Sequence, residues 1–135
     1  MTVLGLDHVA ITVADISQTV DFYSRVLGAE EVYADLRRSG KIPVAVMQVG
    51  ANRINVHAAA APASPHADPP MPGSADICFR WEGTLDDAAA LLSKHGVEVI
   101  EGPVPRPAAN GVVGASVYFR DPDNNLLEFL STEPD

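Results

Sequence analysis

Hydrophobic and polar residues alternate over residues 4–13, which predicts a β-strand with one buried face. A helix is expected next, because Asp15 can cap its first turn and the apolar residues that follow recur at helical spacing. The apolar residues of this helix are Ile16, Val20, Tyr23 and Leu27. Gly28 stands where a left-handed residue commonly ends a helix. Three strand-like runs then complete the first half, at residues 30–36, 43–49 and 53–58.

The second half of the chain predicts the same elements in the same order. Residues 75–81 read as a strand, and Thr84 with Asp87 forms the start of a second helix in the manner of a capping box. The buried stripe expected for this helix contains Leu85, Ala88, Ala89 and Leu92, and Gly96 ends it. Strands are predicted at residues 97–102, 114–120 and 125–131, and the Pro-rich stretch 103–107 is expected to begin a loop.

This repetition extends to the alignment of the two halves. Residues 8–11 align with residues 76–79, and residues 53–57 align with residues 124–128, so His8 matches Asp76 and His57 matches Glu128. Repeated self-similarity marks a repeated supersecondary unit. We therefore expect a single α+β domain of two βαβββ modules, at about residues 4–58 and 74–131. Residues 59–73, rich in Ala and Pro, form the linker between them.

The four matched residues share one kind of position. His8, His57, Asp76 and Glu128 lie on the strand faces opposite the purely apolar faces that pack on the helices. Burying such groups without partners would cost several kcal/mol each. The pattern therefore favours a partly solvated cleft that these polar side chains line. A lone strand histidine is usually structural, and a lone glutamate in a terminal strand usually faces solvent. Two imidazoles and a carboxylate at matched positions instead predict one divalent ion bound by His8, His57 and Glu128.

Composition narrows the classes of partner and location. The net charge of −9 argues against a nucleic-acid partner or an anionic membrane surface. No apolar run approaches the roughly 20 residues that span a bilayer, so a cytoplasmic location is the simplest expectation. Cys78 is the only cysteine, which excludes an intrachain disulfide, and it is expected to be a small buried residue. His66 in the linker and His95 at a helix end are expected to have no functional role.

At these residues the sequence resembles the vicinal oxygen chelate superfamily, which includes glyoxalase I, extradiol dioxygenases, fosfomycin-resistance enzymes and bleomycin-binding proteins. The opening segment LDHVAITVADISQTVDFYSRVLGAEEV is similar to the first strand and helix of that superfamily. The segment VYFRDPDNNLLEFLS is similar to its closing DPDGN-x-x-E signature, with Asn124 in place of the glycine. The resemblance implies two modules that form a curved, partly open eight-stranded cleft with helices outside.

The resemblance also implies a ligand set. In the family, metal ligands come from the first and fourth strands of each module, and His8, His57, Asp76 and Glu128 hold those positions here. Asp76 replaces a histidine that is common in the family, so it could be a fourth ligand or a base beside the ion. The bleomycin-binding members lack such ligands. The presence of His8, His57 and Glu128 in this chain therefore argues against a protein that only sequesters a ligand.

The expected cofactor is one divalent metal ion: Fe²⁺, Zn²⁺, Ni²⁺ or Mn²⁺. Two reactions are compatible with such an ion. The first is dioxygenation of a small-molecule diol or enolate. The second is glyoxalase-type isomerase or lyase chemistry, in which Glu128 or Asp76 moves a proton. Tyr118 could donate a hydrogen bond in either reaction. The alternative is a non-catalytic ligand-binding or antibiotic-resistance protein of the same fold. The open sheet edges and the family resemblance predict a homodimer.

Overall fold

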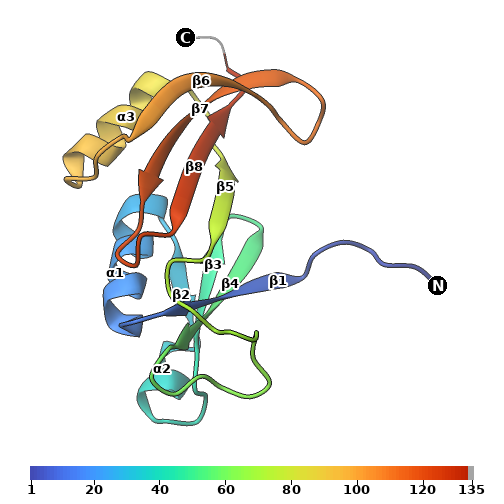
Figure 1. Ribbon diagram of the computed structural model, residues 1–135, viewed down its shortest axis with the longest axis vertical. Helices are drawn as coiled ribbons and strands as arrows, with labels where there is room; N and C mark the ends of the chain where they lie inside the picture. Colours follow the sequence, from blue (N-terminus) through green and yellow to red (C-terminus); the bar gives the residue numbers. More distant parts are fainter. Residues whose placement is uncertain (134–135) are drawn as a thin grey trace. The chain divides into compact units, whose positions relative to one another are not determined.

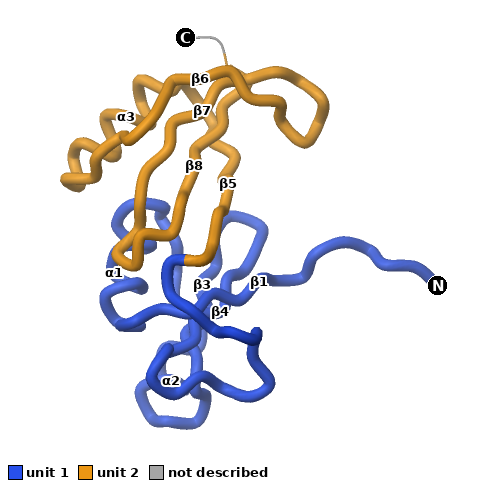
Figure 2. Tube along the Cα trace, viewed as in Figure 1, with its two compact units in different colours: residues 1–73 blue, residues 74–135 orange. Residues whose placement is uncertain are grey.

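A computed structural model describes residues 1–133 of the chain. The chain divides into two compact units (Figure 2). Unit 1 comprises residues 1–73, and unit 2 begins at residue 74. Each unit contains one four-stranded mixed sheet together with its own helices (Figure 1). Neither sheet closes into a barrel, and the α+β fold class expected from the sequence is confirmed. Among residues 1–133, no helix is both long and apolar enough to cross a bilayer.

Unit 1 follows the predicted order of elements with one addition. Its elements are β1 (His8–Val13), α1 (Ile16–Leu27), β2 (Glu30–Val32), α2 (Ala34–Arg38), β3 (Ala45–Val49) and β4 (Asn52–Ala58). The strands lie in the order β1-β4-β3-β2, with β1 parallel to β4 and the other neighbours antiparallel. One face of this sheet, including Ile11, Val13 and Val56, is buried with the apolar face of α1.

Helix α1 has the ends that its sequence predicts. The Asp15 carboxylate accepts a hydrogen bond from the amide of Gln18 at 3.0 Å, and Gly28 ends the helix with φ 65°. The fully buried residues of α1 are Thr19, Phe22, Tyr23 and Val26. The predicted stripe shares only Tyr23 with this set, because the helix presents the side between Thr19 and Val26 to the sheet.

Helix α2 replaces part of a predicted strand. We expected residues 30–36 to be extended, but β2 ends at Val32 because Tyr33 adopts a left-handed conformation with φ 60°. The chain then forms one helical turn through residues with good helix propensity. Arg37 of this turn donates from Nε and Nη2 to both carboxylate oxygens of Glu31, at 2.5 and 2.9 Å. This bidentate ion pair connects α2 to β2.

Unit 2 consists of β5 (Asp76–Arg80), α3 (Leu85–Lys94), β6 (Glu101–Pro107), β7 (Val113–Arg120) and β8 (Leu126–Ser131). Its strand order is β5-β8-β7-β6, with β5 parallel to β8. Helix α3 contacts β7 and β8, and Thr84 caps it by accepting a hydrogen bond from the Asp87 amide at 3.2 Å. The apolar core of this unit includes Phe119 and Phe129, whose ring centroids are 4.8 Å apart.

Strand β6 lies where the sequence predicted a loop. The expected strand at residues 97–102 and the Pro-rich loop after it are wrong, because the strand begins at Glu101 and runs through three prolines. Those prolines are Pro103, Pro105 and Pro107. Amide groups alternate between the two sides of a strand, so the three missing donors fall on one side. As β6 is an edge strand, the other side keeps the amides of Val104 and Arg106 toward β7.

Candidate functional site

The polar face of unit 1 is built from β1 and β4, which run side by side in parallel. Their register pairs His8 with Arg53 and Thr12 with His57, and the pair between them is Ala10 with Asn55. Alternation along both strands puts these six residues on the side of the sheet opposite the buried apolar residues. The predicted face is therefore confirmed for unit 1.

His8 is exposed and has a defined hydrogen-bond partner. Its Nδ1 lies 2.7 Å from Oδ1 of the neighbouring Asp7. Since a carboxylate only accepts, the neutral imidazole carries its proton on Nδ1 and keeps the lone pair of Nε2. A histidine oriented in this way by a carboxylate is the usual form of a metal-binding imidazole.

The register separates the two histidines that the sequence placed together. His57 pairs with Thr12, which lies four residues beyond His8 on β1. At about 3.3 Å per residue, this places the Cα atoms of the two histidines roughly 13 Å apart along the sheet. Two rings that stand perpendicular to the sheet at these positions are too far apart to share one ion at ~2.1 Å from each nitrogen. His57 as a ligand stays a prediction, and this register gives it no support alongside His8.

The same register corrects the alignment of the two halves. In unit 2, Glu128 of β8 pairs with Cys78 of β5. The matching pair in unit 1 is Ala10 with Asn55, so Asn55 rather than His57 is the counterpart of Glu128. The sequence alignment paired the wrong residues because the loops between the strands differ in length in the two halves. Alternation of hydrophobic residues repeats every two positions, so it fits Asn55 and His57 equally well.

Glu128 is a buried carboxylate of unit 2, with 8% of its surface exposed. The Ser116 hydroxyl, itself buried on β7, donates a hydrogen bond to Oε2 of Glu128. Glu128 pairs with Tyr118 on one side and with Cys78 on the other, and Tyr118 pairs in turn with Glu101. A row of polar groups therefore crosses this sheet, with Glu128 as its buried member.

Cys78 lies in this row and is exposed, so its expected burial is wrong. Local desolvation, followed by the charge of the adjacent Glu128 carboxylate, raises the pKa of the Cys78 thiol to about 11. A thiol with this pKa is protonated at neutral pH and is a poor nucleophile. The expectation that Cys78 is not a nucleophile agrees with this shift.

Tyr118 is held by Arg106, which was not among the predicted site residues. The Nε–H of Arg106 donates to the Tyr118 hydroxyl oxygen at 2.9 Å, and the guanidinium lies 5.5 Å from the ring centroid. Because Arg106 occupies a lone pair of the oxygen, the Tyr118 O–H remains able to donate to a bound molecule. Arg106 was missed since its segment was read as a loop, although the alternation of Val104 and Arg106 between prolines was a signal of a strand.

Asp76 lies at the start of β5 and is exposed. It occupies the same face as Glu128, whose strand partner Cys78 lies two residues further along β5. Unit 2 thus contains two carboxylates and Tyr118 on one face, whereas unit 1 contains His8 and His57 on its own. Within residues 1–133, no three His, Cys, Asp or Glu side chains are grouped closely enough to hold a metal ion.

Comparison with known proteins identifies the family. The profile of the Glyoxalase/Bleomycin resistance protein/Dioxygenase superfamily matches residues 5–129. The glyoxalase domain-containing protein RDO1 of Mycosarcoma maydis is 40% identical over 131 residues, which cover 97% of this chain and 70% of the relative. The virulence protein STM3117 of Salmonella typhimurium is 39% identical over 128 residues, or 95% of this chain and 84% of the relative.

Solved structures agree with this assignment. The crystal structure of the Salmonella protein has a TM-score of 0.87 at 37% identity, covering 98% of this chain and 100% of that one. The fosfomycin resistance protein FosX of Listeria monocytogenes, in complex with Mn(II) and 1S,2S-dihydroxypropylphosphonic acid, has a TM-score of 0.66 at 25% identity. That comparison covers 96% of this chain and 90% of the FosX chain. The ligand in that complex carries two hydroxyl groups on neighbouring carbons.

Proposed function

The chain belongs to the Glyoxalase/Bleomycin resistance protein/Dioxygenase superfamily, and from this we propose that it is a divalent-metal-dependent enzyme acting on a small molecule with two neighbouring oxygens. The observation that carries the proposal is the environment of Glu128. A buried carboxylate costs free energy unless its charge is compensated, and the groups that hydrogen-bond Glu128, the Ser116 hydroxyl and the Cys78 thiol, are neutral. A bound cation would provide that compensation.

The donor groups fit a divalent ion of the transition series. The Nδ1–H of His8 donates to Asp7, which leaves the Nε2 lone pair for a metal ion, and Glu128 supplies a carboxylate held by Ser116. Imidazole with carboxylate suits Fe²⁺, Zn²⁺, Ni²⁺ and Mn²⁺. The FosX relative was solved with Mn(II), which supports this choice.

The residues around Glu128 divide the remaining tasks. A bound ion of this kind acts as a Lewis acid and orients the substrate oxygens. Tyr118, fixed by Arg106, donates its O–H to a substrate oxygen on the same face. Asp76, exposed on that face, either completes the ligand set or moves a proton. Asp76→Asn separates these roles, because loss of a ligand weakens metal binding, whereas loss of a base lowers kcat and leaves metal binding intact.

Metal binding is the first test of this function. In metal-free full-length protein titrated with Mn²⁺, the signal of free Mn²⁺ in electron paramagnetic resonance gives the dissociation constant. Glu128→Gln should weaken binding at least about tenfold, since one ligand charge is removed. Glu101→Gln is the matched control, because Glu101 belongs to the same row of the sheet but is exposed at its edge. Equal affinity of wild type and Glu128→Gln would contradict the proposal.

The reaction class needs a second measurement. Dioxygenation consumes O₂, so Fe²⁺-loaded protein would take up oxygen with a member of a catechol panel. Isomerase or lyase chemistry would instead change the absorbance of 2-oxo thiohemiacetals without oxygen uptake. Tyr118→Phe should lower kcat in either case while leaving Mn²⁺ affinity unchanged. A protein that binds metal and ligands but shows neither reaction would favour the non-catalytic ligand-binding alternative.

A further inference from the structure

Arg53 is a cation on the polar face of unit 1 that the proposed metal chemistry does not use. It lies on β4 beside His8 of β1, because the register of these parallel strands pairs the two residues. Gln48 of β3 pairs with Arg53 on its other side, and Glu30 of β2 pairs with Gln48. A row of four polar side chains therefore crosses this sheet, with the proposed metal ligand His8 at one end.

The guanidinium of Arg53 is held by two neighbours. Its Nε donates a hydrogen bond to Oε1 of Gln48 at 2.8 Å. Its Cζ lies 5.6 Å from the ring centroid of Tyr33, which directly follows β2, and this distance is within the range of a cation–π contact. These contacts fix a long side chain before any ligand binds, so binding costs less conformational entropy.

The two terminal nitrogens of this guanidinium have no partner within the described chain. Neither Nη1 nor Nη2 of Arg53 is hydrogen-bonded to residues 1–133, and neither is a buried atom, so a dissolved molecule can reach both. No carboxylate in the same range forms an ion pair with Arg53, although the chain has 18 acidic residues. Two adjacent N–H donors match the two oxygens of a carboxylate.

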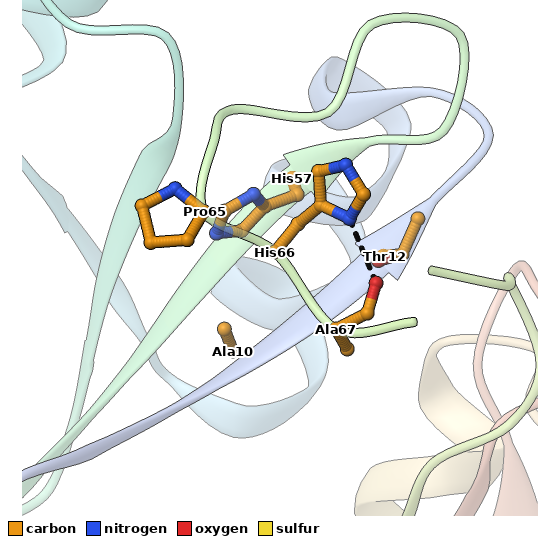
Figure 3. A pocket seen from close by; sticks show the side chains of 6 residues that line it. All are labelled: Ala10, Thr12, His57, Pro65, His66 and Ala67. Atoms are coloured by element: carbon orange, nitrogen blue, oxygen red, sulfur yellow. Dashed lines mark hydrogen bonds between the residues drawn. The ribbon is translucent and has the colours of Figure 1, made fainter. Parts of the chain in front are cut away.

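The opposite end of the polar face offers no comparable group. There the linker lies over β1 and β4 and borders a pocket of about 300 Å³ (Figure 3). None of its lining residues is acidic, Lys or Arg: they are Ala10, Thr12, His57, Pro65, His66 and Ala67. Among the residues that β1 and β4 place on this face, Arg53 is the one permanent cation. A single cation balances one negative charge, which favours a carboxylate over a doubly charged phosphate.

We propose that Arg53 binds a carboxylate of the substrate, so that the substrate class is a small molecule with two neighbouring oxygens and a separate carboxylate. This inference rests on the proposed function, because it takes His8 as a ligand of the metal ion. Gln48 and Tyr33 hold the guanidinium on the β3 side of β4, and β1 and β3 are roughly 10 Å apart at about 4.8 Å per strand spacing. The carboxylate is therefore several bonds from the oxygens that bind the ion.

A matched pair of catechols tests this inference in Mn²⁺-loaded full-length protein. 3,4-Dihydroxybenzoate carries a carboxylate across the ring from its two neighbouring hydroxyls, and 3,4-dihydroxybenzamide has nearly the same shape without the charge. In isothermal titration calorimetry, Arg53→Gln should weaken binding of the benzoate about tenfold, as expected for hydrogen bonds to a charged group. Binding of the benzamide should not change, which also shows that the variant is folded.

Arg38→Gln removes an exposed cation elsewhere in unit 1 and is the control for net charge, so it should match wild type with both probes. Unchanged affinity of Arg53→Gln for 3,4-dihydroxybenzoate would overturn the proposal. An equal loss of affinity for both probes would also overturn it, because that result indicates a structural role for Arg53.

Metal-free protein separates this inference from the proposed metal site. In ¹H–¹⁵N NMR titrations, benzoate should cause a saturable shift of the Nε–H signal of Arg53, and benzamide should not. If benzoate shifts this signal but the protein binds no Mn²⁺, the proposed function fails and the carboxylate site stands. Mn²⁺ binding without any saturable shift by benzoate would contradict this inference alone.

Discussion

At the scale of single residues, the ion pair of Glu31 and Arg37 has the clearest consequence for stability. Only 8% of the Glu31 side chain and 20% of the Arg37 side chain are exposed. The two hydrogen bonds from Arg37, opposed in part by desolvation, hold the pKa of Glu31 below its usual value of 4.5. The pair therefore stabilises the fold above that pH, and its contribution is lost as the pH falls through the lowered pKa.

We predict that Glu31→Gln lowers the free energy of unfolding by about 1–3 kcal/mol at pH 7, the range expected for charged hydrogen bonds. The difference from wild type should shrink as the pH falls through and below 4.5, where the wild-type carboxylate becomes protonated. Denaturant titrations at pH 7 and pH 3 measure both values. Asp35→Asn, which removes the exposed pair with Arg38, should cost at most about 0.5 kcal/mol. A difference between wild type and Glu31→Gln that is independent of pH would contradict this account.

At the scale of elements, the turn between β7 and β8 positions Glu128. The buried Asp121 carboxylate accepts hydrogen bonds from the amides of Asp123 and Asn125 at 2.9 Å and from Nδ2 of Asn125 at 2.8 Å. Oδ1 of Asn125 accepts from the amide of Ala75 at 2.9 Å, just before β5. The turn thus links β8 to β5 and fixes the register in which Glu128 pairs with Cys78.

Asp121→Ala should destabilise unit 2 by about 2–3 kcal/mol, because three hydrogen bonds of about 1 kcal/mol each are lost. The rate of amide hydrogen exchange should rise in β5 and β8. The affinity for Mn²⁺ should fall, because the position of the Glu128 side chain is less well fixed. Asn124→Gly is the control, since Asn124 already has φ 66° and glycine adopts that conformation without strain. Unchanged exchange in β5 after Asp121→Ala would show that the turn does not hold this strand.

The elements also show what the sequence could predict. Helix α1 could be predicted from its cap and its terminal glycine, and the faces of β1, β4 and β8 from simple alternation. Helix α2 could not be predicted, because it follows Tyr33 in a left-handed conformation. Strand β6 was missed because its three prolines run against local strand propensity, although Val104 and Arg106 alternate between them.

The candidate site was predicted in its residue types rather than in its register. His8, Asp76 and Glu128 lie on the faces expected, but hydrophobic phase repeats every two residues and could not distinguish Asn55 from His57 as the counterpart of Glu128. The pocket around His57 depends on where the linker folds back, and periodicity carries no information about that segment.

At the scale of the whole molecule, each unit has a sheet with open edges. Strands β1 and β2 border one sheet, and β5 and β6 border the other. Open edges pair readily with further strands, which favours a homodimer. Light scattering should therefore give about twice the 14.3 kDa of one chain. A mass equal to one chain at micromolar concentration would contradict this prediction.

The central claim is that one divalent ion is bound by His8 and Glu128. Pulsed electron paramagnetic resonance of the Mn²⁺-loaded protein tests it directly, because a coordinated imidazole couples its nitrogen to the electron spin. We predict that this coupling is present in wild type, persists in His57→Phe and disappears in His8→Ala. A coupling that survives in His8→Ala and vanishes in His57→Phe would contradict the account.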